Sequence, residues 1–169
     1  MAVEYSLYIK GRKITLKEVK DLFSKEGIEI ISTSDNQEIN YQLTNFKPEI
    51  GLQITVREKG EYPAEHPANA IDTIFLKDEF IYDYRITFRH DKFYEDTLSQ
   101  NRIMYVMVFE IVEYLDCIAI LFGPGGEDIC YFSNKGAYII KGNVNWFENG
   151  CKEDVLLSGE IIYFDGEPM

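Results

Sequence analysis

The stretch from Ile103 to Phe122 is nearly apolar and about as long as a membrane-spanning helix, so it decides which classes of fold are open to this chain. It contains three carboxylates, Glu110, Glu113 and Asp116. Each would cost roughly 2.5–3.5 kcal/mol at the centre of a lipid-facing helix. At a spacing of three residues they share one side of a helix. The stretch therefore predicts a helix packed deep in a protein core, with a narrow solvent-facing stripe, and not a transmembrane segment.

Sequence signals place two principal helices in the chain. The longer is expected from about Tyr94 or Glu95 to Leu115, with a broad apolar face packed against a sheet. The shorter begins at Thr15, because the Thr15 hydroxyl and the Glu18 carboxylate form a capping box that satisfies free amides at a helix start. The apolar residues expected to pack are Leu98, Met104, Val108, Ile111, Val112 and Leu115 in the longer helix, and Leu16, Val19, Leu22 and Phe23 in the shorter.

Alternation of apolar and polar residues predicts the strands. Strands or extended segments are expected at residues 3–9, 28–31, 39–43, 52–58, 80–88, 118–122, 128–133, 137–141 and 160–164. Glycine and prolines make residues 59–69 a long surface loop or a bridge, and Asn134-Lys135-Gly136 favours a hairpin turn. The order of strand, helix, strands, helix and strands predicts an α+β fold. We expect a mainly antiparallel sheet with two principal helices packed on it, in a single domain over residues 1–169.

The charge of the chain narrows the class of partner. It carries 29 acidic and 17 basic residues, for a net charge of −12. Nucleic acids and anionic membranes repel such a surface, whereas a basic protein partner is attracted to it. The alternative is that the acidity serves solubility alone. The N-terminus lacks a secretory pattern and the three cysteines are scattered, which favours a cytoplasmic protein with reduced thiols.

One glycine-rich motif invites a phosphate-binding interpretation. Gly123-Pro124-Gly125-Gly126 could cradle an anion with its backbone amides. It lacks the Lys-Ser/Thr of a P-loop, and the following Glu127 and Asp128 lead into an expected strand and would repel phosphate. The motif therefore favours a tight connection between two strands.

The histidines and cysteines show no spacing typical of a catalytic or metal site. His66 and His90 are the only histidines, and both are expected at the surface. Cys117 and Cys130 lie in apolar, strand-like surroundings, which raise the pKa of a thiol and blunt its reactivity. We therefore assign no catalytic, cofactor or metal-binding residues and expect a protein that is not an enzyme.

Two clusters mix aromatic residues with carboxylates, a composition suited to binding a basic protein. One surrounds Tyr62 and the other surrounds Trp146. The alternative for Trp146 is that it caps the hydrophobic core. The residues predicted to contact a partner are Tyr62, Glu61 and Glu65 in the first cluster, and Trp146, Glu148, Glu153 and Asp154 in the second.

Several blocks of the chain carry a family resemblance. They are the opening Met1-Ala2-Val3-Glu4-Tyr5-Ser6-Leu7-Tyr8-Ile9, the block Ile86-Thr87-Phe88-Arg89-His90-Asp91-Lys92-Phe93, the run Asp116-Cys117-Ile118-Ala119-Ile120-Leu121-Phe122, and Asn145-Trp146-Phe147. Over roughly residues 3–147 the chain resembles a family of bacterial immunity proteins from swarming-inhibition toxin systems. The resemblance implies a non-enzymatic cytoplasmic inhibitor that binds one cognate toxin and protects the producing cell. Because such families vary their toxin-facing surfaces, it assigns no binding residues.

Two other classes of function stay open. A small-molecule-binding or enzymatic α+β domain would show a cavity with convergent polar groups and a perturbed titratable side chain. A scaffolding subunit would show a large exposed apolar face and a stable homo-oligomer.

Overall fold

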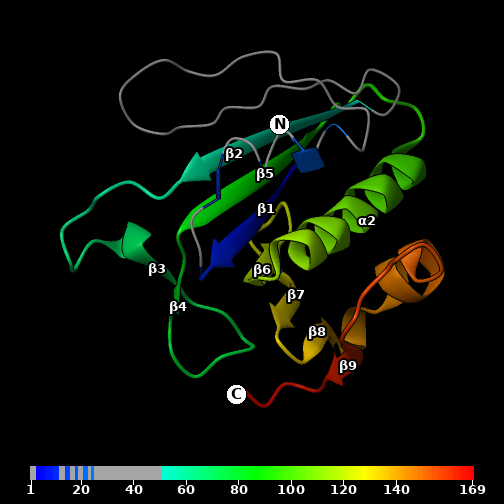
Figure 1. The fold of residues 1–169 in the computed structure, drawn as a ribbon. Coiled ribbons are helices and arrows are strands. Elements are labelled where there is room, and N and C mark those ends of the chain that lie inside the picture. Colours follow the sequence, from blue (N-terminus) through cyan, green and yellow to red (C-terminus); the bar gives the residue numbers. More distant parts are fainter. Residues whose placement is uncertain (1–2, 12–13, 16–17, 19–20, 23, 25–50) are drawn as a thin grey trace.

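A seven-stranded sheet and one long helix dominate the computed structural model of this chain (Figure 1), which describes residues 3–11, 14–15, 18, 21–22, 24 and 51–169. These elements form a single α+β domain, as the sequence predicts. The strands of the large sheet are β1 (Val3–Lys10), β2 (Leu52–Glu58), β5 (Tyr84–His90), β6 (Ile118–Phe122), β7 (Asp128–Ser133), β8 (Gly136–Ile140) and β9 (Glu160–Phe164). The helix is α2 (Thr97–Leu115).

The large sheet is mixed. Its strand order is β2-β5-β1-β6-β7-β8-β9, and each neighbouring pair is antiparallel except β8 and β9, which are parallel. The prediction of a mainly antiparallel sheet is thus confirmed in part, because it did not include the parallel pair β8–β9 at one edge. Gly136, at φ +147°, permits the parallel pairing, because a Cβ atom at this position would lie 1.9 Å from the carbonyl oxygen of Glu160.

Helix α2 ends where the sequence predicts and begins later. Its N-cap is Asp96, whose carboxylate accepts a hydrogen bond from the Ser99 amide at 3.0 Å, so the expected start at residue 94 or 95 is too early. The predicted packing residues of this helix are buried except Leu98, which is 81% exposed in the first turn. Of the three carboxylates in the expected solvent-facing stripe, Glu113 and Asp116 are exposed and Glu110 is partly buried. None of the helices in the described part of the chain has the length and apolarity of a membrane span.

The predicted first helix is shown in part. The Thr15 amide donates to the Glu18 carboxylate at 2.8 Å, and the Glu18 amide donates back to the Thr15 hydroxyl at 3.3 Å, which is the expected capping box. Glu18, Asp21, Leu22 and Ser24 are helical, and Leu22 is buried in the core. The rest of that helix and the segments expected at 28–31 and 39–43 lie outside the described residues.

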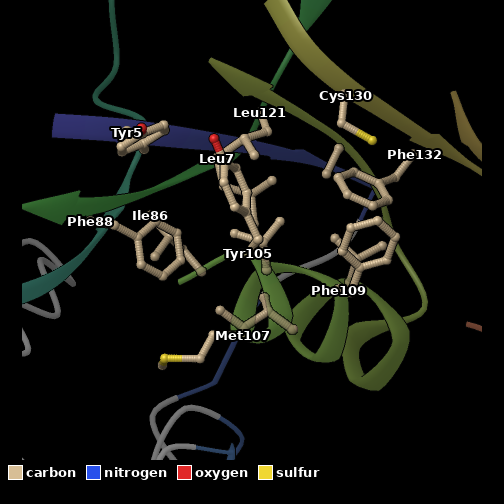
Figure 2. Close-up of a cluster of buried hydrophobic side chains, with 14 of the residues drawn as sticks. Tyr5, Leu7, Ile86, Phe88, Tyr105, Met107, Phe109, Leu121, Cys130 and Phe132 are labelled. Carbon is tan, nitrogen blue, oxygen red and sulfur yellow. The ribbon is translucent and has the colours of Figure 1, made fainter. Parts of the chain in front are cut away.

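Helix α2 covers one face of the sheet and encloses the main core (Figure 2). Phe109 on the helix lies against Phe132 on β7, with the two ring centroids 5.1 Å apart in an edge-to-face arrangement. The core extends along the sheet to Leu7 on β1 and to Ile86 and Phe88 on β5. Because strand side chains alternate between faces, each of these strands turns every second residue toward α2.

The described residues cover only part of the width of the opposite face. Phe75 is fully buried against Tyr131 and Phe164, and its carbonyl accepts a hydrogen bond from the Met169 amide at 2.9 Å. These residues form a second hydrophobic core, which lies between this face of the sheet and a cover made of the segment around Phe75 and the C-terminal residues. The smaller elements of this region are η1 (Pro67–Asn69), β3 (Ala70–Ile71) and β4 (Phe80–Ile81).

The structure corrects one predicted strand. The extended region expected at residues 80–88 divides into β4 and β5, which belong to two different sheets. Asp83 lies at the break, where its amide donates to the carbonyl of Ile9 at 2.8 Å and its carboxylate accepts from the amide of Gly11 at 2.9 Å. These bonds fix the start of β5 to the end of β1. Sequence alternation continues across the break and gives no sign of it.

Candidate functional site

A surface hollow of about 500 Å³ lies between the first turns of α2 and a single π-helical turn, η3 (Trp146–Cys151). Figure 1 shows η3, in orange, beside α2. We call this surface hollow the Trp146 hollow. It is lined by Leu98, Ser99, Asn101, Arg102, Tyr105, Asn143, Asn145, Trp146, Asn149 and Gly150.

The η3 turn is held in place by its apolar residues. Phe147 and Cys151 are both 1% exposed, and the Phe147 ring stacks on Phe109 of α2 with centroids 5.8 Å apart. This anchoring turns Asn145 and Asn149 outward, where both are exposed and the Asn149 amide donates to the Asn145 side-chain oxygen at 2.6 Å. Single π-helical turns occur frequently at functional sites, and here the turn presents a row of side-chain amides.

Trp146 is both a core residue and part of the surface. Its ring packs on Tyr105 of α2, with centroids 4.4 Å apart, and the residue is half-buried against the main core. Its indole Nε1 is buried and has no hydrogen-bond partner among the described residues. This position fits the interpretation of Trp146 as a core cap and leaves part of the residue at the surface, where its contact with a partner stays a prediction.

The carboxylates predicted around Trp146 are mostly engaged within the chain. The Lys152 ammonium lies 2.7 Å from Glu148, and the Arg102 Nε donates to Asp154 at 2.8 Å. Glu153 is exposed and makes no ion pair with a described residue. The cluster thus presents less free negative charge to a partner than the sequence predicts, because intramolecular cations neutralise two of its members.

The other predicted cluster lies elsewhere on the molecule. Tyr62 is 45% exposed and stacks on His66, with ring centroids 4.5 Å apart and nearly parallel planes. Glu61 and Glu65 are exposed beside it in the loop after β2. Figure 1 places this loop, in cyan, at the opposite side of the domain from η3. The predicted contact residues therefore form two separate surfaces.

A second polar surface was missed by the sequence analysis. It covers the face of β2, β5 and β1 that points away from α2, and it contains a hollow of about 290 Å³. We call it the arginine face. It is lined by Glu4, Ser6, Gln53, Thr55, Arg57, Arg85, Thr87 and Arg89. The sequence pattern that could have indicated this surface is the placement of arginines at polar positions of strands in which apolar and polar residues alternate.

The buried titratable groups lie in the core. His90 is 6% exposed, which corrects its expected surface position, and burial lowers its pKa from 6.5 to about 4. Burial raises the pKa of the Cys130 thiol, as the sequence predicts, and raises that of Cys151 to about 12. No group of three or more potential metal ligands is clustered within the described residues.

The glycine-rich loop forms the predicted tight connection, here between β6 and β7. The Gly123 amide donates to the Glu127 carbonyl at 2.8 Å, and the Gly125 amide donates to the Glu127 carboxylate at 2.8 Å. The Glu127 side chain thus occupies the position that an anionic ligand would need.

Comparison with protein families, characterised proteins and solved structures finds no significant match to this chain.

Proposed function

We propose that this chain is a cytoplasmic immunity protein, which is not itself an enzyme, and that it neutralises a bacterial toxin by binding it through the Trp146 hollow. The observation that carries the proposal is the combination of Trp146, Tyr105 and Arg102 around one open hollow. These three residue types dominate the energetically important positions of protein interfaces. Trp146 and Tyr105 are already fixed against each other by packing, so binding would cost little side-chain entropy.

The remaining lining of the Trp146 hollow suits a polypeptide ligand. Asn143, Asn145 and Asn149 are exposed, and a side-chain amide both donates and accepts hydrogen bonds, as a peptide backbone does. Leu98 adds an apolar contact at the rim, because 81% of it is exposed to solvent. A segment of partner chain laid across the hollow would meet hydrogen-bonding groups and apolar area together.

The charge of the chain supports a basic partner. The net charge of −12 attracts cations over a distance, although Glu148 and Asp154 near the hollow are paired internally. We therefore expect charge to accelerate the encounter and the hollow to supply the specific contacts. Raising the salt concentration should lower the association rate constant while changing the dissociation rate constant little.

The test begins with affinity capture of the tagged chain from its own host and identification of the retained protein. The captured partner should arrest growth when expressed alone and be harmless when this chain is co-expressed. Failure to retain a partner, or failure to rescue growth, would contradict the immunity function.

Matched variants test the contact surface. Leu98→Lys should fold normally, since Leu98 is exposed, and should weaken binding by about tenfold or more because it places a positive charge against a basic partner and removes an apolar contact. Trp146→Ala should weaken it further. Tyr62→Ala, in the distant aromatic–acidic loop, is the control and should change affinity less than about twofold. Equal effects of Leu98→Lys and Tyr62→Ala would place the interface elsewhere.

A second candidate function is a small-molecule-binding or enzymatic domain that uses the same hollow. Its volume of about 500 Å³ lies within the usual range for ligand pockets, and its amides could orient a polar ligand. Under this alternative the chain would retain no protein partner, and Trp146 fluorescence would change on addition of a small metabolite fraction from the host.

A further inference from the structure

The arginine face carries two cationic side chains directly opposite each other. Arg57 on β2 and Arg85 on β5 are register partners in the antiparallel pair. Cross-strand partners have Cβ atoms about 4.5–5.5 Å apart, and like charges in this arrangement destabilise a sheet. Neither guanidinium group forms an ion pair with any residue in the described ranges, whereas Arg89 lies 3.7 Å from Glu4. Within the described part of the chain, the face therefore concentrates positive charge that no ion pair compensates at Arg57 and Arg85.

This charge is unexpected on so acidic a chain. An open antiparallel face needs only polar residues to remain solvated, and threonine or glutamine would meet that need without repulsion. Here three arginines face one carboxylate, on a chain whose net charge is −12. A bound anion would remove the repulsion between Arg57 and Arg85, so the cost in the free protein becomes a gain on binding.

Hydroxyl groups lie in register beside the arginine pair. Thr87 on β5 is the partner of both Ser6 on β1 and Thr55 on β2, so the three form one row across the strands. All three are partly exposed within the hollow of about 290 Å³. Hydroxyls donate and accept hydrogen bonds, and this row could therefore contact polar groups next to an anion held by the arginines.

We propose that the arginine face binds a small ligand bearing a phosphate monoester or diphosphate group, held between Arg57 and Arg85. Arginine recognises phosphate through paired N–H donors, and a doubly charged oxyanion can neutralise two guanidinium groups at once. The volume of the hollow fits a small molecule. A long nucleic acid would be repelled by the rest of the acidic surface. This inference is independent of the proposed toxin-binding function.

The test titrates the ¹⁵N-labelled full-length chain with sodium pyrophosphate at constant ionic strength and follows the amide signals. Saturable shifts should centre on β2, β5 and β1, and inorganic phosphate should compete at the same amides. Citrate, a carboxylate polyanion, should bind at least about tenfold more weakly. The absence of saturable shifts at a pyrophosphate concentration of about 10 mM, or equally tight binding of citrate, would overturn the proposal.

Variants on a solvent-facing surface make the assignment specific. Arg57→Gln and Arg85→Gln should each weaken pyrophosphate binding by about tenfold or more, because each removes one half of the paired site. Arg102→Gln at the Trp146 hollow is the matched control and should leave the affinity unchanged. Unaltered binding in the first two variants, or equal weakening in the control, would show that pyrophosphate does not bind at the arginine face.

Discussion

The two halves of the sheet use similar strands and differ in what covers them. Strands β6 to β9 are covered on one face by the α2 side of the domain and on the other by the segment around Phe75 and the C-terminal residues. Strands β2, β5 and β1 pack against the main core on one face and carry the arginine face on the other. The difference teaches that the half with β6 to β9 is built mainly for stability, while the half with β2, β5 and β1 keeps a polar face that the described residues leave exposed.

The sequence of each half explains its covering. The β6 strand Ile118–Phe122 has no charged residue, so both faces must be buried. The β5 strand alternates Tyr84, Ile86 and Phe88 with Arg85, Thr87 and Arg89, so only one face needs a cover. The following predictions test this comparison.

The largest expected effect is in the doubly covered half. Phe75→Ala should lower the free energy of unfolding by about 3–5 kcal/mol, because Phe75 is fully buried and its ring packs on Phe164. Thr87→Ala, on the open face, is the control and should change it by less than about 0.5 kcal/mol. Urea denaturation measures both. Similar losses in the two variants would remove the distinction between the halves.

The parallel edge offers a second test. Gly136→Ala should cost about 2–3 kcal/mol, since the new methyl group would overlap the backbone of Glu160 and displace β9. Gly142→Ala meets no atom within 4 Å and should be nearly neutral. Thermal unfolding of both variants checks the difference. A neutral Gly136→Ala would mean that β9 contributes little to the stability of the covered half.

The singly covered half contains a buried titratable group, His90. Its folded pKa of about 4 lies below the unfolded value of 6.5, so the unfolded state binds the proton more tightly. The neutral ring's contribution is complete above pH 6.5 and is lost as the pH falls toward 4. We expect a loss of about 2 kcal/mol between pH 7.5 and pH 5. His90→Phe should reduce this dependence, as measured by denaturation at the two pH values, and an unchanged dependence in this variant would contradict the role of His90.

The smallest effect concerns the open face itself. Arg57→Gln should raise the free energy of unfolding by about 0.2–1 kcal/mol, because it removes the repulsion from Arg85 across the strands. The gain should shrink in 1 M salt, where charges are screened within about 3 Å. Denaturation at low and high salt measures it. A loss of stability at low salt would show that Arg57 makes a favourable contact in the free protein.

Local signals predicted much of the fold. The Thr15–Glu18 capping box and the end of α2 at Leu115 depend on neighbouring residues, and the structure confirms both. Leu98 was predicted to be buried from its spacing, but it lies in the first turn of α2, beyond the edge of the covered core. The division of residues 80–88 depends on hydrogen bonds from Asp83 to residues far away in sequence, which no local pattern contains.

The candidate site was predicted less completely. Trp146 stood out by residue type, and the structure places it at a hollow. The ring that packs on Trp146, Tyr105, comes from α2 and is distant in sequence. The pairing of Glu148 and Asp154 with cations depends on helical spacing and on a tertiary contact, which a count of charges does not reveal. The arginine face escaped notice because its residues come from three strands that only the sheet order brings together.

Native-state hydrogen exchange of the free chain tests the comparison most directly. Strands β5 and β7 are matched, since each lies between two neighbours in the sheet, but of the two only β7 is covered on both faces by the residues that the structure describes. We predict that the slowest β7 amides exchange only through global unfolding, and that those of β5 exchange about tenfold or more faster through smaller openings. Equal protection in β5 and β7 would contradict the conclusion that stability is concentrated in the doubly covered half.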